Sequence, residues 1–186
     1  YLHTLKRPLT YEEAESIFNP VLDGLRAVHE QGLLHLDIKP ENIFLRKDST
    51  PILIDFGGAR HQLGKESVAV SFLVASEGYA PNEQYSGHKL QATTDIYAVA
   101  ATLYRSIAGK SPVDAKVRAV SLIDKTPDPL ISTRQLFKQG QYPNHFLQAI
   151  DDALSMRIAE RPQSVRELQQ RLFTKPKSEF NTKLLG

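Results

Sequence analysis

Apolar residues recur every three to four positions from about Tyr11 to Gln31, and this spacing predicts an amphipathic helix. Thr10 and Glu13 have the spacing of a capping box, in which each side chain accepts a hydrogen bond from a free backbone N–H of the first turn. Pro20 is expected to bend the helix locally, and Gly32 is expected to end it.

A change of pattern follows this helix. Residues 43–46 and 51–54 are short β-prone runs, and the polar residues 47–50 between them predict a turn, so the three segments form a small hairpin. Residues 57–89 are rich in Gly, Ser and other polar residues and predict a long loop. A loop of this length inside a compact domain is usually functional or disordered.

The most apolar helix of the chain is predicted from about Asp95 to Ile107. Its apolar residues cover almost every face, which is typical of a helix that is buried rather than laid on a surface. Thr93 and Thr94 are expected to cap its beginning. Gly109 is expected to end it.

The remaining part of the chain predicts fewer regular elements. Residues 111–142 contain several prolines and a short helix at most, and two further helices are expected at 144–156 and from Ser164 to Phe173. The pattern predicts a mainly α fold (α+β), with about six helices around one buried central helix and a small β-hairpin. We expect one domain at residues 1–173 and a linker or tail at 174–186.

The composition limits the classes of protein to which the chain can belong. The chain has 186 residues, and its 41% apolar and 24% charged residues are ordinary for a globular domain. Lys and Arg exceed Asp and Glu by only 23 to 21, which argues against a nucleic-acid partner. There is no Cys, and no apolar run reaches the ~20 residues of a membrane span. These features favour a cytoplasmic location, although the protein from which the chain comes is free to be membrane-anchored.

Candidate chemistry lies in two clusters on either side of the hairpin. The first is the run His-Leu-Asp-Ile-Lys-Pro-Glu-Asn at residues 35–42, and the second is Asp-Phe-Gly at residues 55–57. Because a hairpin returns the chain to its starting point, both clusters are expected to meet at one end of it. Their carboxylate, ammonium and amide groups are those that phosphoryl transfer requires, since that reaction depends on positioning and on charge neutralisation.

The two clusters resemble the catalytic loop and the Asp-Phe-Gly triplet of protein kinases. Residues 78–85 (Gly-Tyr-Ala-Pro-Asn-Glu-Gln-Tyr) resemble the end of the kinase activation segment, residues 95–98 resemble the start of the central helix, and Arg161-Pro162 resembles a late Arg of that family. An isolated Asp-Phe-Gly is a common turn, but five matches in the family's order are not coincidental. The nearest variety is the bacterial serine/threonine kinase, and the resemblance runs from about residue 7 to 173.

The resemblance implies a role for each catalytic position. Asp37 would be the catalytic base, and Lys39 would steady the transferred phosphoryl group. Asn42 and Asp55 would hold Mg²⁺ beside ATP, which fits the preference of this ion for a few protein oxygens together with phosphate and water oxygens.

The resemblance also implies roles in binding and support. Phe44 and Ile54 would form the lower wall of the adenine pocket. Ser76 would replace the usual Thr that bonds the catalytic Asp, and Ser67 and Ser71 lie in the same loop.

Three further features concern structure rather than chemistry. Asp95 would bind the backbone of the catalytic loop, and Glu83 with Arg161 would form a buried ion pair. His35 is expected to pack beneath the Phe of the Asp-Phe-Gly triplet, and His29 is expected at the surface or edge of its helix. No metal role is assigned to any of the six His.

The chain departs from the family in two respects. It contains no Gly-rich loop, Val-Ala-Ile-Lys strand or Glu-bearing helix, so the resemblance is to the C-terminal lobe with the N-terminal lobe absent. The chain begins at Tyr1 and its only Met is Met156, which indicates a piece of a longer or trimmed protein. Leu36 replaces the Arg that pairs with an activation-loop phosphate, so we expect independence from that phosphorylation.

These observations favour the catalytic and substrate-binding lobe of an ATP- and Mg²⁺-dependent serine/threonine kinase, which acts on Ser and Thr hydroxyls of proteins. By itself the lobe is expected to be inactive. It is also expected to self-associate through the apolar face that the N-terminal lobe would cover. The alternative is a pseudokinase or truncated lobe that binds a partner protein and transfers nothing.

Overall fold

The computed structural model describes residues 2–56, 60–61 and 75–174. Within them it contains seven α-helices: α1 (Tyr11–Glu30), α2 (Asn82–Ser86), α3 (Ala92–Ala108), α4 (Ala115–Ile123), α5 (Thr133–Leu136), α6 (Asn144–Ala153) and α7 (Val165–Phe173). Two antiparallel pairs of strands accompany them: β1 (Leu33–Leu34) with β4 (Arg60–His61), and β2 (Ile43–Leu45) with β3 (Pro51–Leu53). The described residues also form the short 3₁₀ helices η1 (Leu2–Thr4), η2 (Pro40–Asn42) and η4 (Ile158–Glu160).

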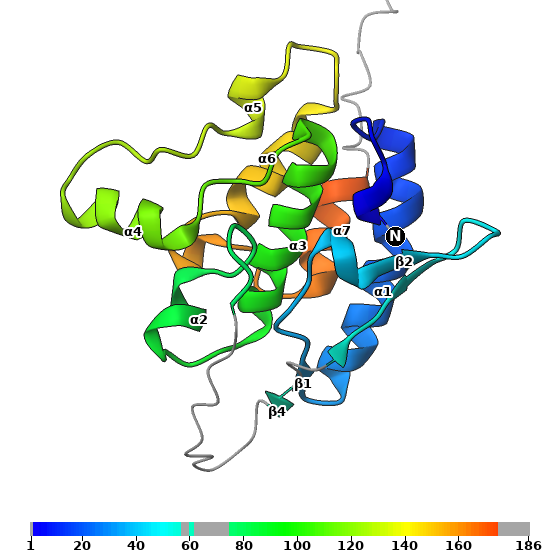
Figure 1. Ribbon diagram of the computed structural model, residues 1–186, viewed down its shortest axis with the longest axis horizontal. Coiled ribbons are helices and arrows are strands. Elements are labelled where there is room, and N and C mark those ends of the chain that lie inside the picture. The colour runs from blue at the N-terminus through cyan, green and yellow to red at the C-terminus, as the bar shows by residue number, and fades with distance from the viewer. Residues whose placement is uncertain (1, 57–59, 62–74, 175–186) are drawn as a thin grey trace, which may run out of the picture.

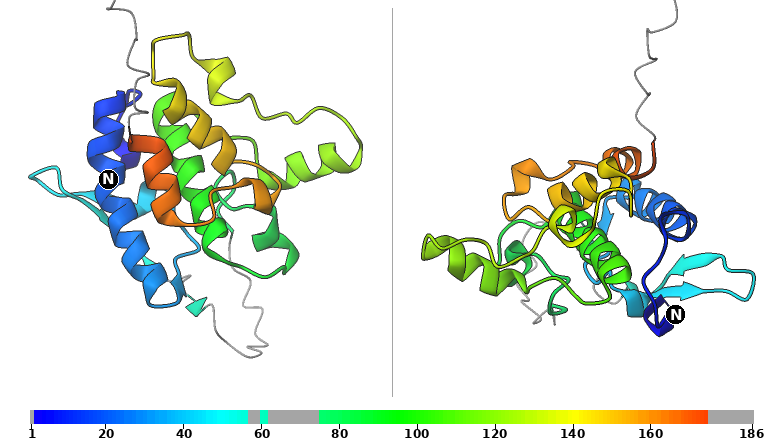
Figure 2. Two further views of the ribbon diagram at one scale, coloured as in Figure 1. Left: turned by 180° about the vertical axis from the view of Figure 1, so that it is seen from behind. Right: turned by 90° about the horizontal axis from the view of Figure 1, so that it is seen from above.

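Helix α3 is the centre of the fold, and the other long helices pack around it (Figures 1 and 2). Its side chains are buried on nearly every face, as its composition predicts. The cap was predicted wrongly, because Gln91 and not a Thr is the N-cap residue and the helix begins at Ala92. Thr94 is instead the third helical residue and bonds back to the Gln91 N–H. The mainly α fold with a buried central helix and a small hairpin is therefore confirmed.

Helix α1 has the predicted boundaries. Glu13 accepts a hydrogen bond from the Thr10 N–H (2.9 Å), and Thr10 accepts one from the Glu13 N–H (3.2 Å), so the capping box is present. Pro20 lies inside the helix without ending it, and Gly32 follows the last turn at φ 70°, a conformation that favours glycine.

The hairpin is also confirmed, with Ile43 opposite Leu53 and Leu45 opposite Pro51. The β1–β4 pair was not predicted, because two-residue strands leave no periodicity in the sequence.

The remaining predictions of regular elements were partly wrong. Residues 111–142 contain two short helices rather than one, and α6 ends at Ala153, three residues before the predicted end. The predicted tail falls almost entirely outside the described residues, and so does about half of the loop predicted at residues 57–89. The prediction of a loop was wrong at its end, where helix α2 forms. Among the described helices none is both long and apolar enough to cross a membrane.

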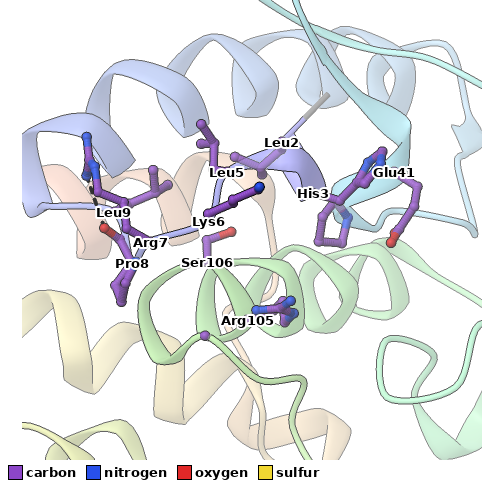
Figure 3. Close-up of a pocket in the computed structure, with 12 residues that line it drawn as sticks. Leu2, His3, Leu5, Lys6, Arg7, Pro8, Leu9, Glu41, Arg105 and Ser106 are labelled. Carbon is purple, nitrogen blue, oxygen red and sulfur yellow. Dashed lines mark hydrogen bonds between the residues drawn. The ribbon is translucent and has the colours of Figure 1, made fainter.

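The segment before α1 is docked onto the core (Figure 3). Leu2 and Leu9 are each only 3% exposed. The Leu9 N–H donates to the carbonyl of Ser106 in α3 (3.0 Å), and the Tyr142 hydroxyl donates to the Leu9 carbonyl (2.6 Å). This segment therefore has a fixed position against the C-terminal end of α3.

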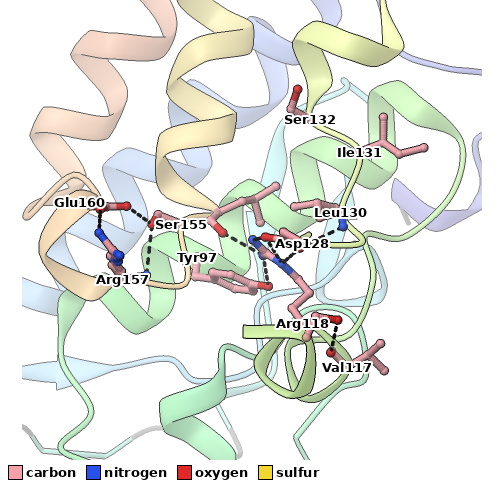
Figure 4. A network of polar contacts seen from close by, with 12 residues as sticks. Tyr97, Val117, Arg118, Asp128, Leu130, Ile131, Ser132, Ser155, Arg157 and Glu160 are labelled. Atoms are coloured by element: carbon pink, nitrogen blue, oxygen red, sulfur yellow. Dashed lines mark hydrogen bonds and ion pairs between the residues drawn. The ribbon is translucent and has the colours of Figure 1, made fainter. Parts of the chain in front are cut away.

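A buried arginine fixes α4 and the loop that follows it (Figure 4). Arg118 is 3% exposed and pairs with Asp128 through Nη2 (2.7 Å) and Nε (3.0 Å). Its Nη1 donates to the Tyr97 hydroxyl (3.1 Å) and to the Leu154 carbonyl (2.8 Å). One guanidinium thereby joins α4 to the central helix and to the end of α6.

A second buried arginine joins α2 to the segment before α7. The Nη1 and Nη2 of Arg161 lie 2.6 Å and 3.2 Å from the two carboxylate oxygens of Glu83, and both residues are less than 5% exposed. Arg161 also donates to the carbonyls of Thr93 and Ser155, and its guanidinium lies over the Tyr97 ring. Every nitrogen of this guanidinium therefore has a hydrogen-bond partner inside the protein.

Replacement of Arg161 with Leu is expected to lower the free energy of unfolding by about 3–5 kcal/mol, because it leaves the Glu83 carboxylate buried without its partner. Urea unfolding of the purified protein measures this loss. The matched control is Arg157→Leu, whose pair with Glu160 is exposed and should contribute less than about 1 kcal/mol. The Glu83→Leu/Arg161→Leu double variant should be less destabilised than the sum of the single ones. Equal effects of Arg161→Leu and Arg157→Leu would contradict a structural role for the pair.

Candidate active site

The loop at residues 35–42 is held by the carboxylate of Asp95, in the first turn of α3. Asp95 is fully buried and accepts hydrogen bonds from the backbone N–H groups of His35 (2.9 Å) and Leu36 (2.8 Å). The His29 imidazole Nε2 lies 2.7 Å from the same carboxylate. His29 was predicted at the surface or edge of its helix, and the prediction missed this contact: the side chain is 11% exposed and points from the last turn of α1 toward Asp95.

Leu36 has a left-handed backbone, with φ 65°. This conformation is unfavourable for a residue with a branched side chain and persists only where the surroundings impose it. Here the Asp95 carboxylate binds the Leu36 N–H, and the Gln84 side-chain amide donates to the Leu36 carbonyl (2.8 Å). The Leu36 side chain is 4% exposed, so an apolar group fills this position.

The Asp37 carboxylate is surrounded by three of the predicted site residues. Its Oδ1 accepts a hydrogen bond from the Ser76 hydroxyl (2.6 Å). Its Oδ2 lies 2.8 Å from the Lys39 ammonium and accepts a hydrogen bond from the Asn42 side-chain amide (2.9 Å). Lys39 also donates to Ser76 Oγ (2.9 Å). The structure therefore brings Asp37, Lys39, Asn42 and Ser76 into direct contact.

The side chain of Asn42 is oriented by the same cluster. Its Nδ2 donates to the Asp37 carbonyl (2.7 Å) and carboxylate, which leaves the amide oxygen as the atom suited to a metal. The Ile54 N–H donates to the Asn42 carbonyl (2.9 Å). Asp55 is the next residue along the chain after Ile54. Asp55 is exposed and has φ 64°. One carboxylate and one amide oxygen fit Mg²⁺, which usually keeps several water and phosphate ligands.

His35 is packed beneath the aromatic ring of Phe56, as predicted. Their ring centroids are 4.6 Å apart, and His35 is fully buried. Burial lowers the pKa of the imidazole, although the Asp95 charge opposes this effect. Nδ1 accepts a hydrogen bond from the Asp37 N–H (3.3 Å), and Nε2 lies 3.2 Å from the Ile54 carbonyl. These partners match a neutral imidazole with its proton on Nε2, which supports a structural role.

Other predicted residues lie along the hairpin and outside the cluster. Phe44, in β2, is 37% exposed, and Ile54, just after β3, is half-buried. Ser67 and Ser71 lie outside the described residues.

Asp114 is a buried carboxylate that sequence reasoning did not single out. It accepts hydrogen bonds from the Gly78 N–H (3.1 Å), the Tyr85 hydroxyl (3.1 Å) and the Lys116 N–H (2.9 Å). Burial, together with Asp114, raises the pKa of the Tyr85 phenol. Gly78 has φ 79°, and a Cβ there would lie 3.2 Å from the Pro112 carbonyl oxygen. Asp114 therefore fixes the segment that begins at Ser76 and forms one wall of the cluster.

Comparison with known proteins gives a consistent result. The model of the protein kinase domain matches residues 1–174. Serine/threonine-protein kinase D of Synechocystis sp. is 37% identical over 113 residues, which are 58% of this chain and 22% of that protein. Serine/threonine-protein kinase PknD of Mycobacterium tuberculosis is 30% identical over 165 residues, which are 87% of this chain and 24% of that protein.

A solved structure agrees with this assignment. The apo form of PpkA-294 superposes with a TM-score of 0.67 and 27% sequence identity, over 90% of this chain and 61% of that one. The chain thus spans about a quarter of the length of these curated relatives and less than two thirds of the solved structure. Because the family model matches residues 1–174 of the 186 in this chain, the chain belongs to the protein kinase family. Its described residues correspond to the mainly helical lobe of a bacterial-type serine/threonine kinase, the lobe that carries the catalytic loop.

Proposed function

We propose that the protein containing this chain is a serine/threonine protein kinase, which transfers the γ-phosphoryl group of ATP to Ser and Thr hydroxyls of proteins. The observation that carries this proposal is the Asp37 carboxylate, oriented at once by Ser76, Lys39 and Asn42. The Asp37 side chain is 22% exposed, so a substrate hydroxyl can reach it.

The hydrogen bonds around Asp37 indicate where a substrate hydroxyl would bind. A carboxylate has about four acceptor sites, and Oδ2 uses two of them for Lys39 and Asn42. Oδ1 uses one for Ser76. The remaining acceptor site on Oδ1 is suited to orient the substrate hydroxyl and to accept its proton as the new bond to phosphorus forms.

Lys39 and the metal-binding residues supply positive charge to the same place. The Lys39 ammonium lies between Asp37 and Ser76 and is 26% exposed, so it can contact a phosphoryl oxygen without moving far. Asn42 and Asp55 would hold Mg²⁺, which neutralises phosphate charge when it is bound. We further propose that Phe44 and Ile54 contact the adenine and that an N-terminal lobe outside these 186 residues holds the ATP phosphates from above.

A face of the lobe remains open for such a partner. Phe44 is 37% exposed and Phe56 is 44% exposed, so both rings offer apolar surface to a partner. We propose that an N-terminal lobe covers them in the longer protein and that a second copy covers them when that lobe is absent.

The first prediction from this proposal concerns Asp37. In the full-length protein, Asp37→Asn should lower kcat by about 10²–10⁴-fold, because it removes the group that accepts the hydroxyl proton. Transfer of labelled phosphate to a Ser/Thr protein substrate measures this loss. The control is Asp124→Asn, an exposed carboxylate at the end of α4, which should leave kcat unchanged. Undiminished transfer in Asp37→Asn would contradict the proposal, and an inactive wild-type protein would favour a partner-binding module instead.

The second prediction concerns the hydroxyl that orients Asp37. Ser76→Ala should lower kcat by about tenfold or more, since a hydrogen bond to a charged group is lost. Ser76→Thr keeps the hydroxyl and should keep most of the activity. Equal activities of the Ala and Thr variants would show that this hydrogen bond has no part in the reaction.

The third prediction concerns Leu36. Because a buried Leu cannot bind a phosphate, the kinase should not depend on phosphorylation of its activation loop. The full-length Ser67→Ala/Ser71→Ala variant should therefore retain wild-type kcat in the same transfer assay. A large loss of activity that Asp or Glu at either position restores would contradict this expectation.

A further inference from the structure

A cavity of about 400 Å³ lies between the N-terminal segment, the 3₁₀ helix η2 of the catalytic loop and the C-terminal turn of α3 (Figure 3). The N-terminal wall is anchored at both ends, because Leu2 and Leu9 are buried and Leu9 is hydrogen-bonded to Ser106 of α3. The cavity is therefore preformed, as ligand-binding pockets usually are.

The cavity is lined by more positively charged than negatively charged side chains. Lys6, Arg7 and Arg105 contribute positive charge, and Glu41 is the one carboxylate among the lining residues. Arg7 is already paired with Glu13, which lies 2.7 Å and 2.5 Å from its guanidinium nitrogens. The carboxylate of Glu13 is therefore already bound to Arg7, and this hydrogen bond lowers the pKa of Glu13 to about 2.

Lys6 and Arg105 are the other two cations of the cavity, and Arg105 also interacts with the Tyr79 hydroxyl. Neither has a carboxylate within ion-pair distance in the described part of the chain. Lys6 comes from the N-terminal segment and Arg105 from α3, whereas Glu41 lies beside His3 at one end of the cavity (Figure 3). Two cations that line one pocket are suited to bind an anionic group there.

The cavity borders the proposed catalytic cluster on two sides. Pro40 and Glu41 line it and lie between Lys39 and Asn42, which both contact Asp37. Burial raises the pKa of the Tyr79 phenol, and the charge of Arg105 opposes this effect. Arg105 therefore lies near the segment that also supplies Ser76. A peptide whose hydroxyl reaches Asp37 has neighbouring residues within reach of this cavity.

We propose that this pocket binds an acidic side chain of the peptide substrate, close in sequence to the phosphorylated Ser or Thr, with Lys6 and Arg105 as its partners. The inference rests on the proposed kinase function and adds a substrate class to it. The anion is a carboxylate or a phosphorylated side chain, since both accept hydrogen bonds from a guanidinium and an ammonium.

The first test uses the full-length protein and a panel of Ser-containing peptides in which each flanking position carries Glu, Ala or Lys. At one or more positions Glu should raise kcat/KM over Ala by about tenfold, the effect of one charge-assisted hydrogen bond. The quantity to compare is this Glu/Ala ratio within each variant, so that a change in overall activity does not affect it. Arg105→Glu and Lys6→Glu should abolish or invert the ratio, and Arg105→Lys should restore part of it.

Control variants are available outside the cavity. Lys47→Glu, in the hairpin turn, and Arg166→Glu, on the exposed face of α7, make the same charge changes and should leave the ratio unchanged. A ratio near one in the active wild-type kinase would overturn the proposal. So would a Glu preference that persists in Arg105→Glu and Lys6→Glu, or one that is lost equally in the controls.

A binding measurement separates this inference from the proposed function. Fluorescence anisotropy of the same peptides, labelled and without ATP, should show tighter binding of the Glu peptide than of the Lys peptide, and Arg105→Glu should remove the difference. This result would support the pocket even if no phosphate were transferred, and equal affinities would overturn it. A phosphoserine peptide in place of the Glu peptide then identifies which anion the pocket prefers.

Discussion

The Asp95 carboxylate is the interaction on which the site depends. It lies fully buried in the first turn of α3, where a helix favours negative charge, and it accepts hydrogen bonds from the backbone of the catalytic loop and from His29. A buried carboxylate without such partners would be strongly unfavourable, so the loop and the helix stabilise each other. This anchor holds Leu36 in a left-handed conformation and directs the following Asp37 side chain toward solvent.

The proposed catalytic cluster joins segments that are far apart along the chain, and each segment has its own buried anchor. Asp95 holds the loop that carries Asp37, and Asp114 holds the segment that begins at Ser76. The pair of Glu83 and Arg161 fixes α2 at the end of that segment. Polar groups thus position the site, while the apolar core around α3 provides a rigid support.

The residues proposed to transfer the phosphoryl group and those proposed to select the peptide lie on different elements. The groups around Asp37 come from the catalytic loop and the segment after residue 75, whereas Lys6 and Arg105 come from the N-terminal segment and the far end of α3. If both proposals hold, substitutions in the cavity change which peptide is bound and leave the residues proposed to transfer phosphate intact. The cavity adjoins the proposed catalytic cluster, because η2, which contains Asn42, forms part of its wall.

The sequence by itself determined the helix α1 with its capping box, the hairpin and the buried helix α3, because periodicity and turn residues are local signals. The order of its motifs also indicated the family and the residues of the cluster. Only the tertiary structure decided that His29 turns inward to Asp95, that Gln91 caps α3 and that Lys6 and Arg105 line one cavity. Such contacts join residues distant in the chain, and their geometry depends on how the helices pack, which no local pattern encodes.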